Sequence, residues 1–139
     1  MIEAYGGTIN IFNNPYSAMI YGGSDLEEVA APSTLNIYSK DLSASLVTNF
    51  DNINFFLPPN IKNGDTVLTT NIADLTNTTV RAGVQGNANL STGGTIVLIK
   101  SDHLTTTNTT YGTLSEGVSL DYDLTVEQAD NTSKIKKAF

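Results

Sequence analysis

The chain has 139 residues, a formal net charge of −7 and no cysteine. Its length fits one domain, and the absence of cysteine excludes a disulfide scaffold, thiol chemistry and the commonest structural zinc sites. The few cations form no concentrated basic face and no stretch reaches the roughly 18 apolar residues that span a bilayer, so we expect no nucleic-acid partner and no membrane insertion by this segment.

Apolar and polar residues alternate in short runs along the chain, and this period of two predicts β-strands with one face in a core. The runs are "TINIF" at residues 8–12, "TLNIY" at 34–38, "INFFL" at 53–57 and "TVRAGVQ" at 79–85. We expect the following residues to face the core: Ile9, Ile11, Leu35, Ile37, Ile53, Phe55, Leu57, Val80, Ala82 and Val84.

The stretch after residue 57 predicts where one strand ends and the next begins. Pro58 and Pro59 lack a backbone N–H, so they end the pairing of the strand before them. The run "KNGD", residues 62–65, predicts a tight turn because its glycine supplies a positive φ. We therefore expect the following strand to begin at Thr66.

Two more runs predict strands in the second half of the chain. "TIVLI", residues 95–99, is apolar throughout, so we expect both of its faces to be covered. "VSLDYDLTVE", residues 118–127, predicts a half-buried strand with Leu120, Tyr122 and Leu124 on the core side. Weaker strands are predicted at "SAMIY" and "TVLTT", and residues 25–31 and 39–48 could each hold a helical turn.

The spacing of these runs predicts how the strands are arranged. The strand starts lie roughly 15 to 26 residues apart, which favours a solenoid whose turns bury their apolar faces against one another. A β-sandwich more often shows strand signals every 8 to 12 residues or so, and the weaker strands shorten the spacing toward that value. We expect an all-β fold over residues 1–139 as a single unit, a solenoid in preference to a β-sandwich.

A long stretch of the chain resembles a known family. "STLNIYSKDLSASLVTNFDNINFFLPPNIKNGDTVLTT", followed by "VRAGVQG" and "LSTGGTIVLIKSD", is similar to the last part of the passenger region of bacterial autotransporter adhesins. In that family, runs of the form LNIY, NFxxINFxLP, NGDTxL and L-x-x-G-x-x-x-x-LI occur shortly before the outer-membrane β-barrel. The match covers most of Ser33 to Asp102.

The resemblance implies a right-handed parallel β-helix with a C-terminal cap, exported to the bacterial cell surface. It implies a non-enzymatic structural or adhesin segment, with a host-surface protein or glycan as its ligand and with neighbouring passenger rungs and a barrel domain in the full-length chain. No run after Val126 alternates over the roughly 10 residues of a membrane strand. We therefore expect this chain to be part of a longer protein.

The residues capable of catalysis are few. His103 is the only histidine, and a triad would have to use its sequence neighbours Ser101 and Asp102, whereas triads are assembled from separate elements. We expect His103 to be a solvated turn residue. Asp121, Asp123 and Glu127 could act as acid and base on a glycoside or hold calcium, but we expect a solvent-facing acidic row.

The remaining motifs are compatible with binding or with structure alone. "SDLEEV", residues 24–29, is more consistent with an N-capped turn than with a metal loop, and the glycosylation motifs are expected to be compositional. Exposed tyrosines could stack on sugars, so a carbohydrate-binding or glycan-active module is the alternative function and a virion fibre segment a third. We expect no catalytic residue, cofactor or metal site. The tyrosines are Tyr5, Tyr16, Tyr21, Tyr38 and Tyr111, and the motifs begin at Asn77, Asn89, Asn108 and Asn131.

Overall fold

The structure is a computed structural model of the chain. It describes residues 1–23, 32–84, 95–114, 123–129 and 132–138, and for the last two ranges it describes the backbone alone. Strands, turns, bends and irregular connections make up all of these residues, with no helix among them. They contain no helix long and apolar enough to cross a membrane.

The described strands divide between two sheets, called sheet A and sheet B. Odd-numbered strands up to β9 lie in sheet A, and even-numbered strands up to β10 lie in sheet B, so the chain alternates between the sheets. Sheet A also contains β11 and β12. The bounds are β1 Ile2–Glu3, β2 Thr8–Ile11, β3 Met19–Tyr21, β4 Thr34–Ile37, β5 Leu42–Thr48, β6 Asn52–Leu57, β7 Thr66–Asp74, β8 Thr79–Val84, β9 Thr95–Thr105, β10 Thr110–Thr113, β11 Asp123–Ala129 and β12 Thr132–Ala138.

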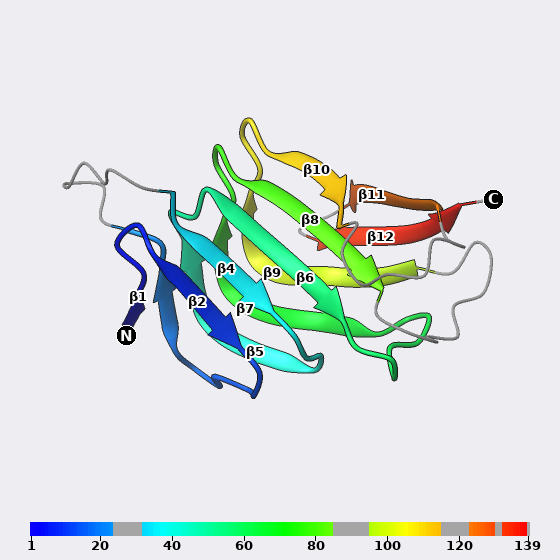
Figure 1. Cartoon of the computed structure of the whole chain (residues 1–139), viewed down its shortest axis with the longest axis horizontal. Helices are drawn as coiled ribbons and strands as arrows, with labels where there is room; N and C mark the ends of the chain where they lie inside the picture. Colours follow the sequence, from blue (N-terminus) through cyan, green and yellow to red (C-terminus); the bar gives the residue numbers. More distant parts are fainter. Residues whose placement is uncertain (24–31, 85–94, 115–122, 130–131, 139) are drawn as a thin grey trace.

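The order of strands within each sheet shows a parallel β-solenoid (Figure 1). Sheet B runs β10-β8-β6-β4-β2, and sheet A runs β1-β3-β5-β7-β9-β12-β11. Every pair from β1 to β10 is parallel. Each turn, or rung, therefore stacks on the previous one, which confirms the predicted solenoid and rules out the sandwich, whose strands pair antiparallel.

The rungs differ in length, which explains why the sequence shows no strict repeat. Asn10 and Asn36 occupy equivalent positions in neighbouring rungs and are 26 residues apart, whereas Asn36 and Asn54 are 18 apart. Thr79 and Thr110 are 31 apart. The loops that join the strands absorb these differences, and the strands stay in register.

The core lies between the two sheets and is built from columns of apolar side chains. Leu35, Ile53 and Val80 are at one register position of sheet B and are buried. Ile37, Phe55 and Ala82 fill the next inward position. Ile11, Leu57 and Val84 are also buried, while Ile9 is half-buried in the first rung. The alternation in the sequence therefore predicted the inward face correctly.

The stretch from β6 to β7 has the predicted form. The strand ends at Leu57, and the Ile61 N–H donates to the Pro58 carbonyl at 3.0 Å. Gly64 has a φ of 89°, and the Asp65 N–H donates to the Lys62 carbonyl at 3.1 Å. β7 begins at Thr66, as expected from the sequence.

Recurring left-handed asparagines mark the corner where the chain leaves sheet A for sheet B. Asn49, Asn77 and Asn108 follow β5, β7 and β9 with φ values of 64°, 59° and 53°. Asparagine tolerates this conformation better than most residues. Asn77 and Asn108 therefore have a defined place in the fold, and the compositional origin of their glycosylation motifs stays a prediction. The motifs at Asn89 and Asn131 lie outside the described residues.

Two predictions along the chain were wrong in detail. Residues 39–48 hold no helical turn, because Leu42, Ala44 and Val47 face the core from β5, which pairs with β3 and β7. Both faces of the apolar run at 95–99 were expected to be covered. The run begins the eleven-residue strand β9, in which Ile96, Leu98 and Ile99 are buried but Val97 is only half-buried.

The parallel stacking of sheet A ends in an antiparallel hairpin. β12 pairs antiparallel with β9, and β11 pairs antiparallel with β12 and contacts β10. The strand predicted at 118–127 is β11, which begins at Asp123; residues 118–122 lie outside the described part. The hairpin covers the C-terminal end of the solenoid (Figure 1).

Substitution of two glycines tests how closely the chain packs at the corners. A Cβ on Gly22 would lie 2.0 Å from the Asn49 carbonyl oxygen, whereas one on Gly64 would meet no atom within 4 Å and would only strain the positive φ. We expect Gly64→Ala to cost about 1 kcal/mol and Gly22→Ala about 3 kcal/mol or more, measured by guanidinium denaturation. Equal losses for the two variants would contradict the close approach at Gly22.

Candidate functional site

The outer face of sheet B carries columns of matching side chains that cross β2, β4 and β6. The strands are parallel and in register, so Asn10, Asn36 and Asn54 share one outward position. Two residues after each asparagine stands an aromatic residue: Phe12 and Tyr38 directly follow β2 and β4, and Phe56 lies within β6. We call these outward residues, together with Arg81 in β8, the ladder face.

The asparagines form a directional chain of hydrogen bonds. Asn36 Nδ2 donates to Asn10 Oδ1 at 3.0 Å, and Asn54 Nδ2 donates to Asn36 Oδ1 at 3.0 Å. Each amide therefore points its N–H toward the N-terminal rung. Within the described residues, Asn10 is the first member, and its own Nδ2 donates to no protein acceptor.

The asparagine column ends at β8. Arg81 takes the register position after Asn54, and its Nη1 donates to Asn52 Oδ1 at 3.1 Å. Asn54 Oδ1 is consequently left buried without a hydrogen-bond partner among the described residues. A buried acceptor without a donor destabilises a fold, so this is a point where the stacking is incomplete.

The aromatic rings stack face to face along the solenoid axis. The Phe12 and Tyr38 ring centroids are 4.6 Å apart with 8° between the planes, and those of Tyr38 and Phe56 are 4.7 Å apart with 7°. The faces of Tyr38 are therefore covered by its neighbours and only ring edges reach the solvent. Sugars stack on ring faces, so this arrangement serves contact between rungs better than it serves sugar stacking.

Hydroxyl groups tie each rung to its predecessor at the corner between the sheets. Thr78 Oγ1 donates to the Phe50 carbonyl and Thr109 Oγ1 to the Leu75 carbonyl, both at 2.6 Å. Ser33 Oγ accepts from the Gly6 N–H of the preceding rung at 3.0 Å and donates to the Gly22 carbonyl within its own corner. Ser33 and Thr78 are buried, so these bonds satisfy backbone acceptors that water cannot reach.

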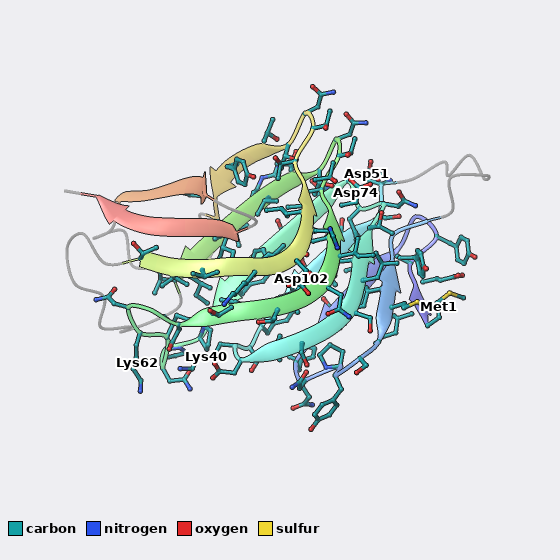
Figure 2. The ribbon with its side chains drawn as sticks, turned by 180° about the vertical axis from the view of Figure 1, so that it is seen from behind. Met1, Lys40, Asp51, Lys62, Asp74 and Asp102 are labelled. Atoms are coloured by element: carbon teal, nitrogen blue, oxygen red, sulfur yellow. The ribbon has the colours of Figure 1, made fainter. Side chains whose placement is uncertain are left out.

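The opposite corner holds an ion pair beside a small open pocket. Lys40 Nζ lies 2.7 Å from Asp65 Oδ2, and the Lys62 N–H donates to the same oxygen at 2.8 Å. Lys40 and Lys62 lie near one another at this corner (Figure 2). The pocket, of about 510 Å³, is lined by consecutive residues of one loop, 59–63, among which Lys62 is the only charged side chain.

The environment of Asp65 lowers the pKa of its carboxyl group below the ordinary value of 3.8. Partial burial by itself raises this pKa. The hydrogen bonds from Lys40 and from the Lys62 backbone, together with the positive charges of both lysines, outweigh that effect. Asp65 therefore stays ionised and paired, which suits a structural anchor and does not suit a general acid.

The chain was compared with models of known protein families, with curated proteins and with solved structures. None of them matches it. The interpretation of the ladder face consequently depends on its geometry and on the chemistry of its side chains.

The proposed neighbours of His103 do not form a triad. Ser101 is buried and its Oγ donates to the His103 carbonyl at 3.1 Å, whereas Asp102 and His103 are exposed. His103 is solvated, as expected, but it lies within β9 and not in a turn. The prediction of a turn was wrong because β9 continues to Thr105 through pairing with β7.

The predicted acidic row is only partly within the described residues. Asp121 and residues 24–29 lie outside them. Asp123 and Glu127 are in β11, where their backbones pair with Ala138 and Lys134. In the part of the chain that the structure describes, no three His, Cys, Asp or Glu residues come together as a metal site.

The five tyrosines do not form one row. Tyr5 and Tyr16 are exposed and Tyr21 is half-buried, all near the N-terminal end. Tyr38 belongs to the ladder face. The Tyr111 hydroxyl is buried and has no hydrogen-bond partner among the described residues.

Sequence reasoning missed the asparagine column and the two phenylalanines of the aromatic stack. A signal was present, because "NIF" and "NIY" stand at the ends of the first two predicted strands and "NFF" stands within the third. An asparagine followed two residues later by an aromatic residue, three times on predicted strands, would have indicated both columns.

The ion pair predicts a pH dependence. A carboxyl group whose folded pKa is depressed stabilises the fold above its unfolded value and loses this contribution as the pH falls through the folded pKa. We expect Asp65→Asn to lower the denaturation midpoint at about pH 6, and the difference from the unmodified chain to shrink below about pH 4.

The matched control is Asp41→Asn, because Asp41 lies 4.0 Å from the same Lys40 but is 72% exposed. Exposed ion pairs contribute little, so this variant should follow the unmodified chain at every pH. An Asp65→Asn difference that stays constant with pH would show that the pair does not titrate as described.

Proposed function

We propose that the chain is a non-enzymatic structural segment of a secreted or cell-surface β-solenoid protein, in which the hairpin β11–β12 closes the C-terminal end of the stack. The observation that carries this proposal is the ladder face. Along the axis, its asparagines hydrogen-bond to one another and its aromatic rings stack on one another, and neither column converges on a pocket. Such side chains hold neighbouring rungs in register.

The electrostatics of the described residues also favour a structural role. Catalytic sites keep acids and bases near a substrate with perturbed pKa values. Asp65 has its charge compensated by Lys40, and the Ser101 hydroxyl is engaged by a backbone carbonyl. These groups stabilise corners and strands of the solenoid.

Several properties suit a surface-exposed rod. Solenoid rungs contact only their neighbours, so a stack gives a stiff, extended body. The net charge of −7 favours solubility, and the cysteine-free sequence allows folding without disulfide formation. The resemblance of residues 33–102 to autotransporter passengers supports export to a bacterial surface, where a host protein or glycan is the expected ligand.

Glycan binding on the ladder face is the second candidate function. The asparagine amides and Arg81 lie beside the aromatic stack, which combines hydrogen-bonding groups with an apolar ridge. The covered faces of Tyr38 weigh against it, because sugar stacking would have to use ring edges or the end of the stack.

Immunolabelling of the source cells tests the proposed location. Antibodies raised against the folded chain should label intact cells or detect the chain in the medium, because a surface or secreted segment is accessible without permeabilisation. Labelling that requires permeabilisation would contradict the proposal. Antibodies against a cytoplasmic protein provide the control for membrane integrity.

A glycan array distinguishes the two candidates. The structural proposal predicts that any weak glycan binding survives in both Tyr38→Ala and Asn36→Ala. Binding that both variants abolish and that Ile72→Ala retains would favour the second candidate, because Ile72 is exposed on the outer face of sheet A.

A further inference from the structure

Sheet B carries a single charged side chain, that of Arg81. Its five described strands, β2, β4, β6, β8 and β10, contain no aspartate, glutamate or lysine, although the chain has 14 acidic residues. Arg81 is in β8, which lies between β6 and β10 (Figure 1). Charge pairing within the sheet therefore does not explain this cation.

The guanidinium of Arg81 has no anionic partner among the described residues. Arg81 is half-buried, and its Nη1 donates to Asn52 Oδ1 at 3.1 Å. The ion pairs in the described part of the chain both involve Lys40 and not Arg81. A guanidinium has five N–H donors, so most of those of Arg81 remain available to a ligand.

A row of hydroxyl and amide side chains passes beside Arg81. Thr8, Thr34, Asn52, Thr79 and Thr110 occupy one register position of the five strands, and each is exposed or half-buried. We call these five residues the polar row. Thr110 Oγ1 donates to Thr79 Oγ1 at 2.9 Å. Neighbouring strands are about 4.8 Å apart, so the row presents hydrogen-bonding groups at regular intervals along the axis.

Asn52 joins the cation to this row. Its Oδ1 accepts the bond from Arg81, whereas Asn54, the direct register partner of Arg81 on β6, has an Oδ1 without a donor. The guanidinium is therefore held on the side of the polar row. On β10 the register partner is Gly112, which has no side chain to cover Arg81. An orientation that is fixed before binding reduces the entropy cost of binding.

The chemistry of this surface suits a ligand with one carboxylate beside several hydroxyl groups. A guanidinium binds a carboxylate through two parallel hydrogen bonds. Arg81 is the only cation of the described strands of sheet B, so it balances a single negative charge, whereas a phosphate monoester carries about −1.5 to −2 at pH 7. Threonine and asparagine side chains both donate and accept hydrogen bonds, as sugar hydroxyls do.

We propose that Arg81 and the polar row bind an acidic oligosaccharide. A carboxylate of the sugar pairs with the guanidinium, and sugar hydroxyls bond to Thr79, Thr110 and the Nδ2 of Asn52. This ligand class rests on the proposed function, in which a glycan is an expected ligand. The net charge of −7 does not prevent binding, because the strands of sheet B carry no acidic residue and salt screens exposed charges beyond about 8 Å.

An NMR titration of the isotope-labelled chain with a trimer of galacturonic acid tests the site. The matched ligand is the methyl-esterified trimer, which keeps the sugar rings and loses the charges. The acid should bind at least about tenfold more tightly, because charge-assisted hydrogen bonds are the stronger ones, and it should shift the amides of Thr79 and Arg81. Inorganic phosphate at equal ionic strength should not displace it.

Two pairs of variants assign the binding to these side chains. Arg81→Gln should weaken binding of the acid at least about tenfold, whereas Lys62→Gln removes the same charge at another corner and should leave it unchanged. Thr79→Val should weaken it about threefold through loss of one hydrogen bond. Its control, Thr69→Val, alters an exposed threonine of sheet A and should have no effect. Circular dichroism confirms that each variant has folded.

Several results would overturn the proposal. They are no binding of the acid, equal affinity for the acid and its methyl ester, or an equal loss in Lys62→Gln and Arg81→Gln. Displacement by phosphate, or equally tight binding of a hexaglutamate peptide, would assign the surface to another class of ligand.

The site is distinguishable from the functions proposed above. Binding should survive in Tyr38→Ala and Asn36→Ala, because neither residue belongs to the polar row, and this separates it from sugar stacking on the aromatic rings. Immunolabelling does not depend on these titrations, so failure of the site differs from failure of the proposed location.

Discussion

Parallel, in-register pairing between successive rungs is the constraint on which the rest of this structure depends. It places equivalent residues of neighbouring strands about 4.8 Å apart, so each side chain must be compatible with its counterpart above and below. Buried columns such as Leu35, Ile53 and Val80 satisfy this by apolar packing. On the outer face, amide hydrogen bonds and stacked rings satisfy it for Asn36 and Tyr38.

The local sequence pattern made the strands and their inward faces predictable. Ile53, Phe55 and Leu57 alternate with half-buried neighbours, and Gly64 requires a turn, so both were visible in the sequence. The ladder face was harder to predict because its columns depend on the register between strands that are 18 or 26 residues apart. β5 was missed because it is held by backbone pairing with β3 and β7, which its own short pattern does not reveal.

The two ends of the solenoid have opposite properties, and this asymmetry connects the fold with its proposed roles. The hairpin β11–β12 ends the parallel sheet A with antiparallel pairing. At the other end, β2 keeps a free edge beside exposed Phe12 and Tyr16. Stacked side chains stabilise the body of the solenoid between these two ends.

Amide hydrogen exchange tests the stacking most directly. The account predicts that β4, β6 and β8, each of which lies between two strands of sheet B, exchange more slowly than β2 and β10, since both of their edges are paired. In β2, the amides of Thr8 and Asn10 should exchange fast and those of Ile9 and Ile11 more slowly. Equal protection along β2 and β6, or fast exchange throughout β6, would contradict a parallel stack that ends at β2.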